Sequence, residues 1–151
     1  MTLGLSAVVN AAGYGVIDLE KVVESSQYLK QQNASLEASI KPQASKLEQL
    51  NKELATLQKQ SQTQGANLKQ IETQYQAKMT EFTTLQQSVQ SRVQTTIQNT
   101  NKTFEARVKQ AAEQLRQENS LDLVLNKNAA LAFDSKYDLT AKMIQKVNAI
   151  K

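Results

Sequence analysis

The stretch 47–79, LEQLNKELATLQKQSQTQGANLKQIETQYQAKM, decides the fold that this chain of 151 residues predicts. Apolar residues before and after the segment 61–65 mirror each other, and the numbers of paired positions always sum to 125 or 126. The constant sum, at helical spacing, predicts an antiparallel helical hairpin. The mirrored pairs are Leu57/Leu68, Leu54/Ile71, Leu50/Tyr75, Leu47/Met79, Ile40/Leu85, Leu36/Val89, Leu29/Ile97 and Val22/Phe104.

Glycine supports the position of the turn. From Tyr14 onward the only glycines are Gly15 and Gly65, and Gly65 stands at the centre of the mirror. Glycine adopts turn conformations that a helix interior disfavours, so the pattern predicts two helices meeting at a tip near 61–66. We expect the arm to span 26–118 and to bend at Pro42, which removes one helical amide.

The composition favours an elongated helical chain over a compact globular enzyme. Aromatic residues make up 5% of the sequence, Trp and Cys are absent, and Gln occurs 21 times. Little material is left for a large globular core. The absence of Cys also excludes disulfides and thiolate chemistry.

Short β-strands are predicted on both sides of the arm. Residues 13–18 (GYGVID) have the β-branched, glycine-flanked pattern of a strand, with Asp18 capping a first helical turn that ends near Ser26. Residues 121–126 (LDLVLN) alternate, which predicts a strand that buries its leucines on one face. A turn at 126–128 and a third strand at 130–133 would complete a hairpin, and 140–150 reads as a closing amphipathic helix.

The fold class predicted is therefore mainly α with a small β part, in which the hairpin grows from a base formed by 13–25 and 119–151. Such a base has exposed sheet edges and few large residues to bury, so we expect several chains to associate. This predicts an obligate homo-oligomer. The residues expected at its contacts are Val16, Ile17, Leu121, Leu123, Leu125, Leu131 and Phe133.

The charge is positive but spread along the chain. Eighteen Lys and Arg residues against 14 Asp and Glu residues give a net charge of +4. One interpretation is a weakly cationic surface that favours acidic partners or weak contact with an anionic membrane, and the other is an ordinary solvated helical exterior. The candidate binding cations on the return helix are Lys69, Lys78, Arg92 and Lys102. No segment resembles a nucleic-acid patch, and we expect no nucleic-acid binding at physiological salt.

The first twelve residues, MTLGLSAVVNAA, are small and apolar. They are interpreted either as a signal peptide shortened at its start, which favours export, or as a disordered N-terminus. No apolar run approaches the 18 residues that a transmembrane helix needs.

Catalytic chemistry is not predicted. The chain has no His and no Cys, and it lacks the glycine-rich loops that cradle phosphates, so we expect no enzyme activity, no cofactor, no metal site and no use of ATP. The pairs Glu48/Lys52 and Glu105/Lys109, four residues apart, are interpreted as helix-surface ion pairs.

The two ends of the chain, GYGVIDLEKVVESS (13–26) and LDLVLNKNAALAFDSKYDLTAKMIQKVN (121–148), resemble the Skp (OmpH-like) periplasmic chaperone family. The resemblance implies a homotrimer whose strands form one intersubunit β-barrel. It further implies coiled-coil tentacles that surround a cavity for unfolded outer-membrane proteins in the periplasm. The family often has basic arms, whereas 61–67 (SQTQGAN) carries no charge, which argues against strong electrostatic capture at this tip.

Two functions remain open at this point. The first is an ATP-independent holdase that binds unfolded outer-membrane proteins between its arms and prevents their aggregation. The alternative is a structural or adaptor coiled coil that docks one folded partner through the hairpin tip. A holdase should bind several unrelated unfolded barrels, whereas an adaptor should ignore unfolded chains.

Overall fold

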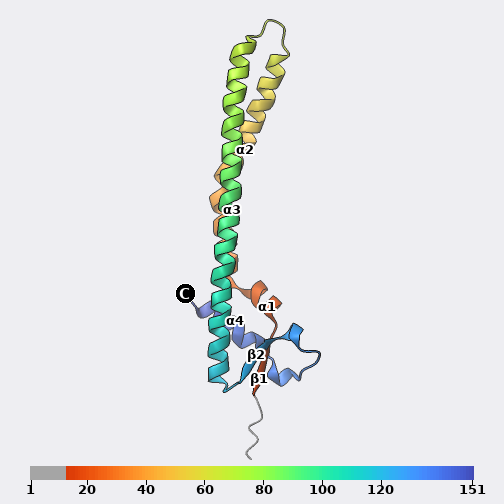
Figure 1. The fold of residues 1–151 in the computed structure, drawn as a ribbon, viewed down its shortest axis with the longest axis vertical. Coiled ribbons are helices and arrows are strands. Elements are labelled where there is room, and N and C mark those ends of the chain that lie inside the picture. The colour runs from red at the N-terminus through yellow and green to blue at the C-terminus, as the bar shows by residue number, and fades with distance from the viewer. Residues whose placement is uncertain (1–12) are drawn as a thin grey trace, which may run out of the picture. The chain divides into compact units, whose positions relative to one another are not determined.

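A computed structural model describes residues 13–151, and the expected signal peptide or disordered N-terminus at 1–12 lies outside these residues. The chain is mainly helical, with few strands (Figure 1). The described residues form two units, an arm unit of 30–102 and a base unit that combines 13–29 with 103–151. The elements, in order, are β1 (Tyr14–Ile17), α1 (Leu19–Ser25), α2 (Gln27–Ser61), α3 (Leu68–Glu118), β2 (Leu123–Asn126), η1 (Lys127–Ala129), η2 (Ser135–Tyr137) and α4 (Thr140–Ala149).

The arm unit is the predicted antiparallel hairpin of α2 and α3. Gly65 reverses the chain with a φ of 83°, a left-handed conformation that glycine adopts without strain. The side-chain oxygen of Asn67 then accepts a hydrogen bond from the amide of Gln70 and caps the start of α3. The mirror symmetry of the sequence thus located both helices and the turn.

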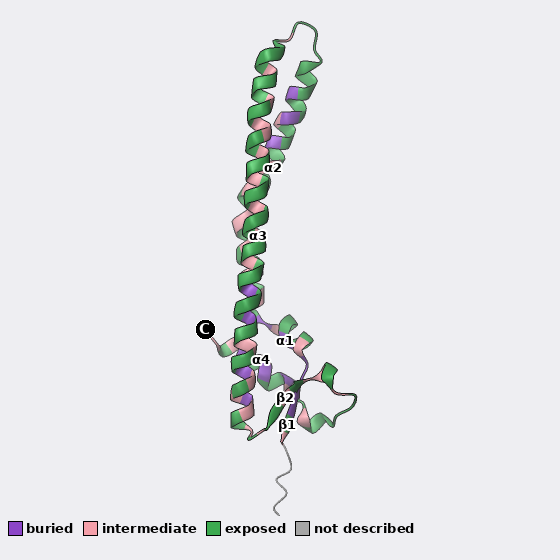
Figure 2. Cartoon of the chain, in the orientation of Figure 1, coloured by how far each residue is buried: buried purple, intermediate pink, exposed green. Residues whose placement is uncertain are grey.

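Leucines of α2 form the centre of the arm. Leu50, Leu54 and Leu57 are buried, and they appear in purple near the tip end of α2 in Figure 2. Of their predicted mirror partners on α3, Ile71 and Tyr75 are half-buried and Leu68 is exposed. Few side chains are fully enclosed, so the arm depends on a narrow seam and not on a broad core.

The seam leaves Ile97 outside, which corrects the mirrored pattern at that position. Ile97 is 47% exposed, whereas Thr96 is half-buried and Thr100 is buried. Successive residues of a helix are rotated by about 100°, and the inward positions of α3 pass through Thr96 and Thr100. The apolar character of Ile97 therefore does not show that its side chain faces the seam.

Proline does not end α2. Pro42 lies within the helix, and the helical assignment is continuous on both sides of it. Pro42 is exposed, so its ring faces water. The bend expected at Pro42 stays a prediction.

The base unit joins the two ends of the chain. β1 pairs with β2 in parallel, with Tyr14 opposite Leu123 and Ile17 opposite Asn126. Around this pair, side chains from β1, α1, α3 and α4 form one core, visible as the buried residues of the base in Figure 2. The buried members are Ile17, Val22, Phe104, Ala111, Leu115, Met143 and Val147.

Two leucine side chains pack closely against Gly15. A Cβ atom built on Gly15 would lie 2.5 Å from Leu139 Cδ1 and 3.1 Å from Leu121 Cδ1. A side chain at residue 15 would therefore require these leucine side chains to shift.

The predicted third strand at 130–133 is absent from the described chain. The residues 127–129 form the 3-10 turn η1 and not a tight hairpin turn, and 130–133 pair with no strand of the described chain. The chain instead returns to β1, where Asp138 forms an isolated parallel bridge with Val16. The side chain of Lys127 is held by Asp18, which fixes the direction of the turn.

The buried face predicted for 121–126 is also corrected. Leu123 and Leu125 are exposed in the chain, whereas Val124 packs against the base core and Leu121 is half-buried. Alternation shows which residues share a face of a strand, but it does not show which face meets the core. The two leucines of β2 are thus left on the outer side.

Candidate functional site

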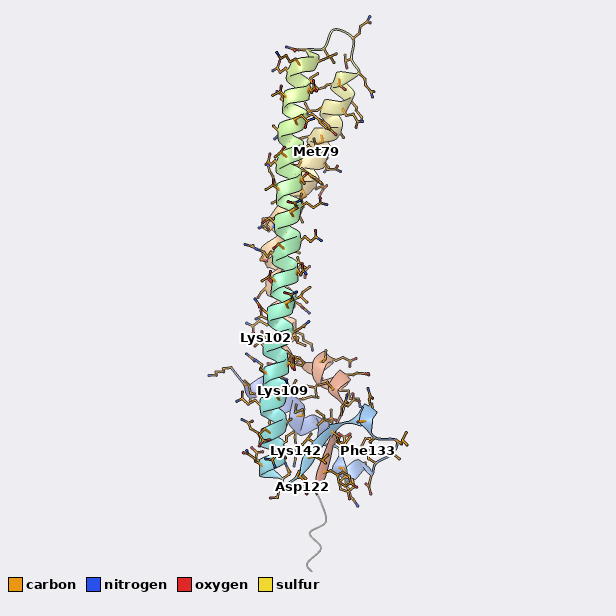
Figure 3. The ribbon with its side chains drawn as sticks, in the orientation of Figure 1. Met79, Lys102, Lys109, Asp122, Phe133 and Lys142 are labelled. Carbon is orange, nitrogen blue, oxygen red and sulfur yellow. The ribbon has the colours of Figure 1, made fainter. Side chains whose placement is uncertain are left out.

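The first candidate surface is apolar and lies on the base unit. Leu123 and Leu125 share the exposed face of β2, and the segment that follows exposes Leu131 completely and Phe133 partly. Phe133 is labelled in Figure 3, on the loop between η1 and η2. We call Leu123, Leu125, Leu131 and Phe133 the base face. Large apolar side chains left exposed on one small unit are typical of an interaction surface.

The other expected contact residues lie elsewhere. Val16 and Ile17 are buried inside the chain's own base, with exposed fractions of 1% and 5%. Leu121 is half-buried against Gly15. The structure therefore divides the seven residues into an internal group and the exposed base face.

A polar network fixes the strands beneath the base face. The carboxylate of Asp18, which is almost fully buried, accepts hydrogen bonds from the amide of Lys21 at 3.2 Å and from Lys127 Nζ. The hydrogen bond from Lys127 lowers the pKa of Asp18, and Asp18 in turn raises the pKa of Lys127. The predicted cap at Asp18 is confirmed, while its distant partner Lys127 had no signal in the sequence.

The same network reaches the start of α4. The amide of Asp18 donates to Thr140 Oγ1 at 2.9 Å, and the amide of Thr140 donates to Asp138 Oδ1 at 2.8 Å. Hydrogen bonds from Thr140 lower the pKa of Asp138. The Asp-x-Thr spacing of 138–140 was the one available signal for this turn. The beginning of the chain is thereby tied to the segment that follows β2.

The four candidate cations are not equivalent. Lys78 Nζ lies 2.8 Å from Glu53 Oε2 and 3.8 Å from Glu81 Oε2, and its hydrogen bond with Glu53 raises the pKa of Lys78. Lys69, Arg92 and Lys102 are exposed and form no ion pair with any residue of 13–151. Lys102 is labelled on α3 in Figure 3. Lys78 stabilises the hairpin, and the other three cations face water.

Both predicted surface ion pairs are present. Lys52 lies 2.6 Å from Glu48, and Lys109 lies 2.6 Å from Glu105. Two further ion pairs, Glu53/Lys78 and Lys46/Glu81, bridge α2 and α3 within the arm unit. Exposed pairs of this kind contribute at most about 1 kcal/mol each, so they set the register of the helices more than their stability.

Hollows line the arm unit near its tip. One of about 660 Å³ and one of about 380 Å³ share Gln60 of α2 and Gln74 of α3. We call these two hollows together the amide groove, because Gln49, Gln60, Gln70, Gln74 and Asn67 are among the residues that line them. A third hollow of about 340 Å³ shares Leu57 with the first and Ile71 with the second, and its apolar lining also includes Leu68 and Tyr75.

Neither a metal centre nor a membrane helix is found in the part of the chain that the structure describes. No group of three acidic side chains is placed there to hold an ion. None of the helices within 13–151 has the length and apolar character needed to span a bilayer.

Comparison with known proteins identifies the family. The model of the family "Outer membrane protein (OmpH-like)" matches residues 13–147, nearly the whole chain. The chain belongs to the OmpH-like family. A crystal structure of a candidate outer membrane chaperone (OmpH-like) from Caulobacter crescentus CB15 resembles this OmpH-like chain with a TM-score of 0.75. The two share 21% identity, over 92% of this chain and 85% of the other, so the likeness concerns the fold. No curated protein matches this OmpH-like chain.

Proposed function

We propose that this OmpH-like chain is an ATP-independent periplasmic holdase chaperone for unfolded outer-membrane proteins. The observation that carries the proposal is the family match over 13–147 on a chain whose fold combines a helical hairpin with a small base unit. The protein binds unfolded barrels in a cavity between its arms and prevents their aggregation. No catalytic group takes part, and release needs no nucleotide.

The oligomer that makes the cavity is a homotrimer. The base face supports this proposal, because four large apolar residues of one chain are left in contact with water. The two-stranded sheet supports it as well, since β2 has β1 as its sole partner among the described strands. Three bases that share their strands form an intersubunit β-barrel and remove the open edges.

The mechanism is passive holding. An unfolded barrel exposes alternating apolar residues and unpaired strand edges, and both aggregate in water. Many weak contacts along several arms keep such a chain enclosed without any one strong site. The client leaves when the outer membrane offers its strands a lower free energy. The exposed cations Lys69, Arg92 and Lys102 add weak attraction to acidic segments and to anionic membrane surfaces.

Aggregation of a urea-unfolded outer-membrane barrel tests the holdase activity. The barrel is diluted into buffer with or without one trimer per client, and light scattering is followed with time. We expect scattering to be suppressed at this ratio and expect no effect of added ATP. Undiminished scattering at a severalfold excess of the protein would remove the proposal.

The trimer is tested separately by the molar mass in solution. We expect about 50 kDa, three times the 16.8 kDa of one chain. The variants Leu123→Asp and Leu131→Asp should lower the mass toward that of one chain. The control is Val23→Asp on α1, which changes an apolar residue that is as exposed as Leu123 (44% against 42%) and is not part of the base face. A trimer that survives both base-face variants contradicts the assignment of the interface.

The alternative is an adaptor that docks one folded partner through the tip. The uncharged segment 61–67 and the 58% exposed Leu68 favour this possibility. Client range separates the two functions. Suppression of aggregation for several unrelated unfolded barrels supports the holdase, and binding restricted to one folded protein supports the adaptor.

A further inference from the structure

The amide groove offers hydrogen-bonding groups that the fold of the chain does not use. Gln60 and Gln74 project from facing helices into both hollows of the groove. Both residues are exposed, and neither amide side chain has a hydrogen-bond partner within 13–151. By contrast, Gln49 donates to Glu53, and Asn67 caps α3. Gln60 and Gln74 are therefore the amides available to a bound molecule.

The charged side chains that line the groove, Lys52, Glu53 and Lys78, are already paired within the chain. Lys52 pairs with Glu48, and Lys78 pairs with Glu53. The hydrogen bond from Lys78 also lowers the pKa of Glu53, so this carboxylate stays ionised. A groove with balanced charges neither attracts an acidic ligand nor rejects a neutral one, and this favours a partner without net charge.

The chemistry of a glutamine amide matches an extended peptide backbone. Each amide carries one acceptor oxygen and two N–H donors. An extended chain presents N–H and C=O groups along its edge in the same alternation, whatever its side chains are. Leu57, which lines the larger hollow, adds an apolar contact that a free amide solute would not need.

We propose that the amide groove binds an extended, uncharged segment of an unfolded polypeptide through hydrogen bonds from Gln60 and Gln74 to its backbone. The inference rests on the proposed holdase function and specifies the part of the client that the arm recognises. Recognition of the backbone explains how one arm can hold clients of unrelated sequence. It also places the contact near the uncharged segment 61–67, with Lys69 as the one candidate cation close to it in the sequence.

The test compares two double variants in the full-length protein. Gln60→Ala with Gln74→Ala removes the groove amides, and Gln58→Ala with Gln76→Ala makes the same change two residues away on the same helices. Gln58 lines the apolar hollow, and Gln76 lines neither half of the groove. All four residues are exposed, so folding should be retained, and circular dichroism and molar mass verify this.

The measured quantity is the dissociation constant for a fluorescent, urea-unfolded barrel, by anisotropy at low and high salt. We expect the groove variant to bind roughly tenfold more weakly, because two neutral hydrogen bonds are lost. The loss should be the same at both salt concentrations, and the control should bind within twofold of the parent. Equal effects of the two variants, or a loss confined to low salt, would overturn the proposal.

A second measurement locates the client directly. The chain has no native Cys, so Ala77→Cys in the groove and Gln76→Cys outside it can each carry a single benzophenone photocrosslinker without loss of Gln60 or Gln74. We expect the probe at 77 to crosslink the unfolded barrel more strongly than the probe at 76. Equal crosslinking contradicts the groove while leaving the holdase intact. A parent protein that neither binds clients nor suppresses aggregation contradicts the holdase itself.

Discussion

Leu50→Ala should make the arm unit easier to open and should leave the stability of the base unit unchanged. Leu50 is fully buried in the narrow seam of the hairpin. Replacing a buried leucine by alanine costs about 2–5 kcal/mol, with the smaller values where neighbours relax into the space. Seam residues such as Tyr75 are only half-buried and have room to move. We therefore expect a loss of about 2–3 kcal/mol in the free energy of opening the arm.

Hydrogen exchange followed by mass spectrometry measures this loss in each unit separately. A loss of that size corresponds to roughly 30- to 150-fold faster exchange of amides in the adjoining parts of α2 and α3. Amides of α4 and β1 should exchange at the parent rate, because they belong to the base unit. The matched control is Leu68→Ala, the same change at a residue that is 58% exposed, which should alter exchange far less.

The reasoning would be refuted by either of two results. If Leu50→Ala and Leu68→Ala accelerate exchange equally, burial in the seam does not determine the stability of the arm. If the amides of the base accelerate as much as those of the arm, the two units open together and are not separate in stability.

Three further changes test other features. Asp18→Asn keeps a capping side chain but removes the charge that Lys127 binds. Because the pKa of Asp18 is lowered from 3.8, its contribution to stability is present above that pH and is lost on acidification below it. Urea titrations at several pH values should therefore show a weaker acid dependence of stability in the variant than in the parent. Gly65→Ala should destabilise the tip by about 1–2 kcal/mol because residue 65 has a left-handed backbone conformation. Steric clash does not contribute, since a Cβ built on Gly65 meets no atom within 4 Å. Gly65→Asn should cost less, and equal hydrogen-exchange rates at the tip in the two variants would argue against the backbone conformation as the cause. Pro42→Ala should stabilise α2 by up to about 3 kcal/mol, because it restores the helical hydrogen bond to the carbonyl of residue 38. The gain should appear as slower hydrogen exchange around residue 38. An unchanged exchange rate would mean that α2 accommodates proline at no cost.

The hairpin was predictable because its determinants are local. Leu50 and its neighbours repeat at helical spacing, and Gly65 is the one residue near the centre of the mirror that readily turns the chain. The cap at Asp18 was predictable for the same reason, since it involves an amide three residues away. The exposure of Ile97 was not predictable. The inward-facing positions shift gradually around a long helix, and the composition does not show how far they have shifted at residue 97.

The base was predicted less well because its determinants are distant in the sequence. Local pattern reading favoured a hairpin between 121–126 and 130–133, whereas β2 pairs in parallel with β1. The inward face of β2 is set by Val124 meeting the base core, and that core includes residues of α3 and α4. No property of the segment 121–126 taken by itself distinguishes its two faces.

The candidate site also has features that the sequence indicates and features that depend on how the helices pair. The candidate cations were chosen from the sequence and stay a prediction, and the ion pair that Lys78 forms with Glu53 depends on the register of α3 against α2. The amide groove depends on that register too, because Gln60 and Gln74 are unremarkable among 21 glutamines until the helices are paired.

The parallel pairing of β1 with β2 has a consequence for the order in which the chain folds. Tyr14 and its partner Leu123 are separated by more than a hundred residues, so a growing chain cannot close its base before its last segment is available. Closing a loop of that length in a disordered chain costs about 4 kcal/mol in entropy. The arm needs only contacts between its own helices, so we expect it to form first and to remove most of the intervening residues from the loop. The hairpin would then act during folding as the spacer that brings the two ends of the chain within reach of each other.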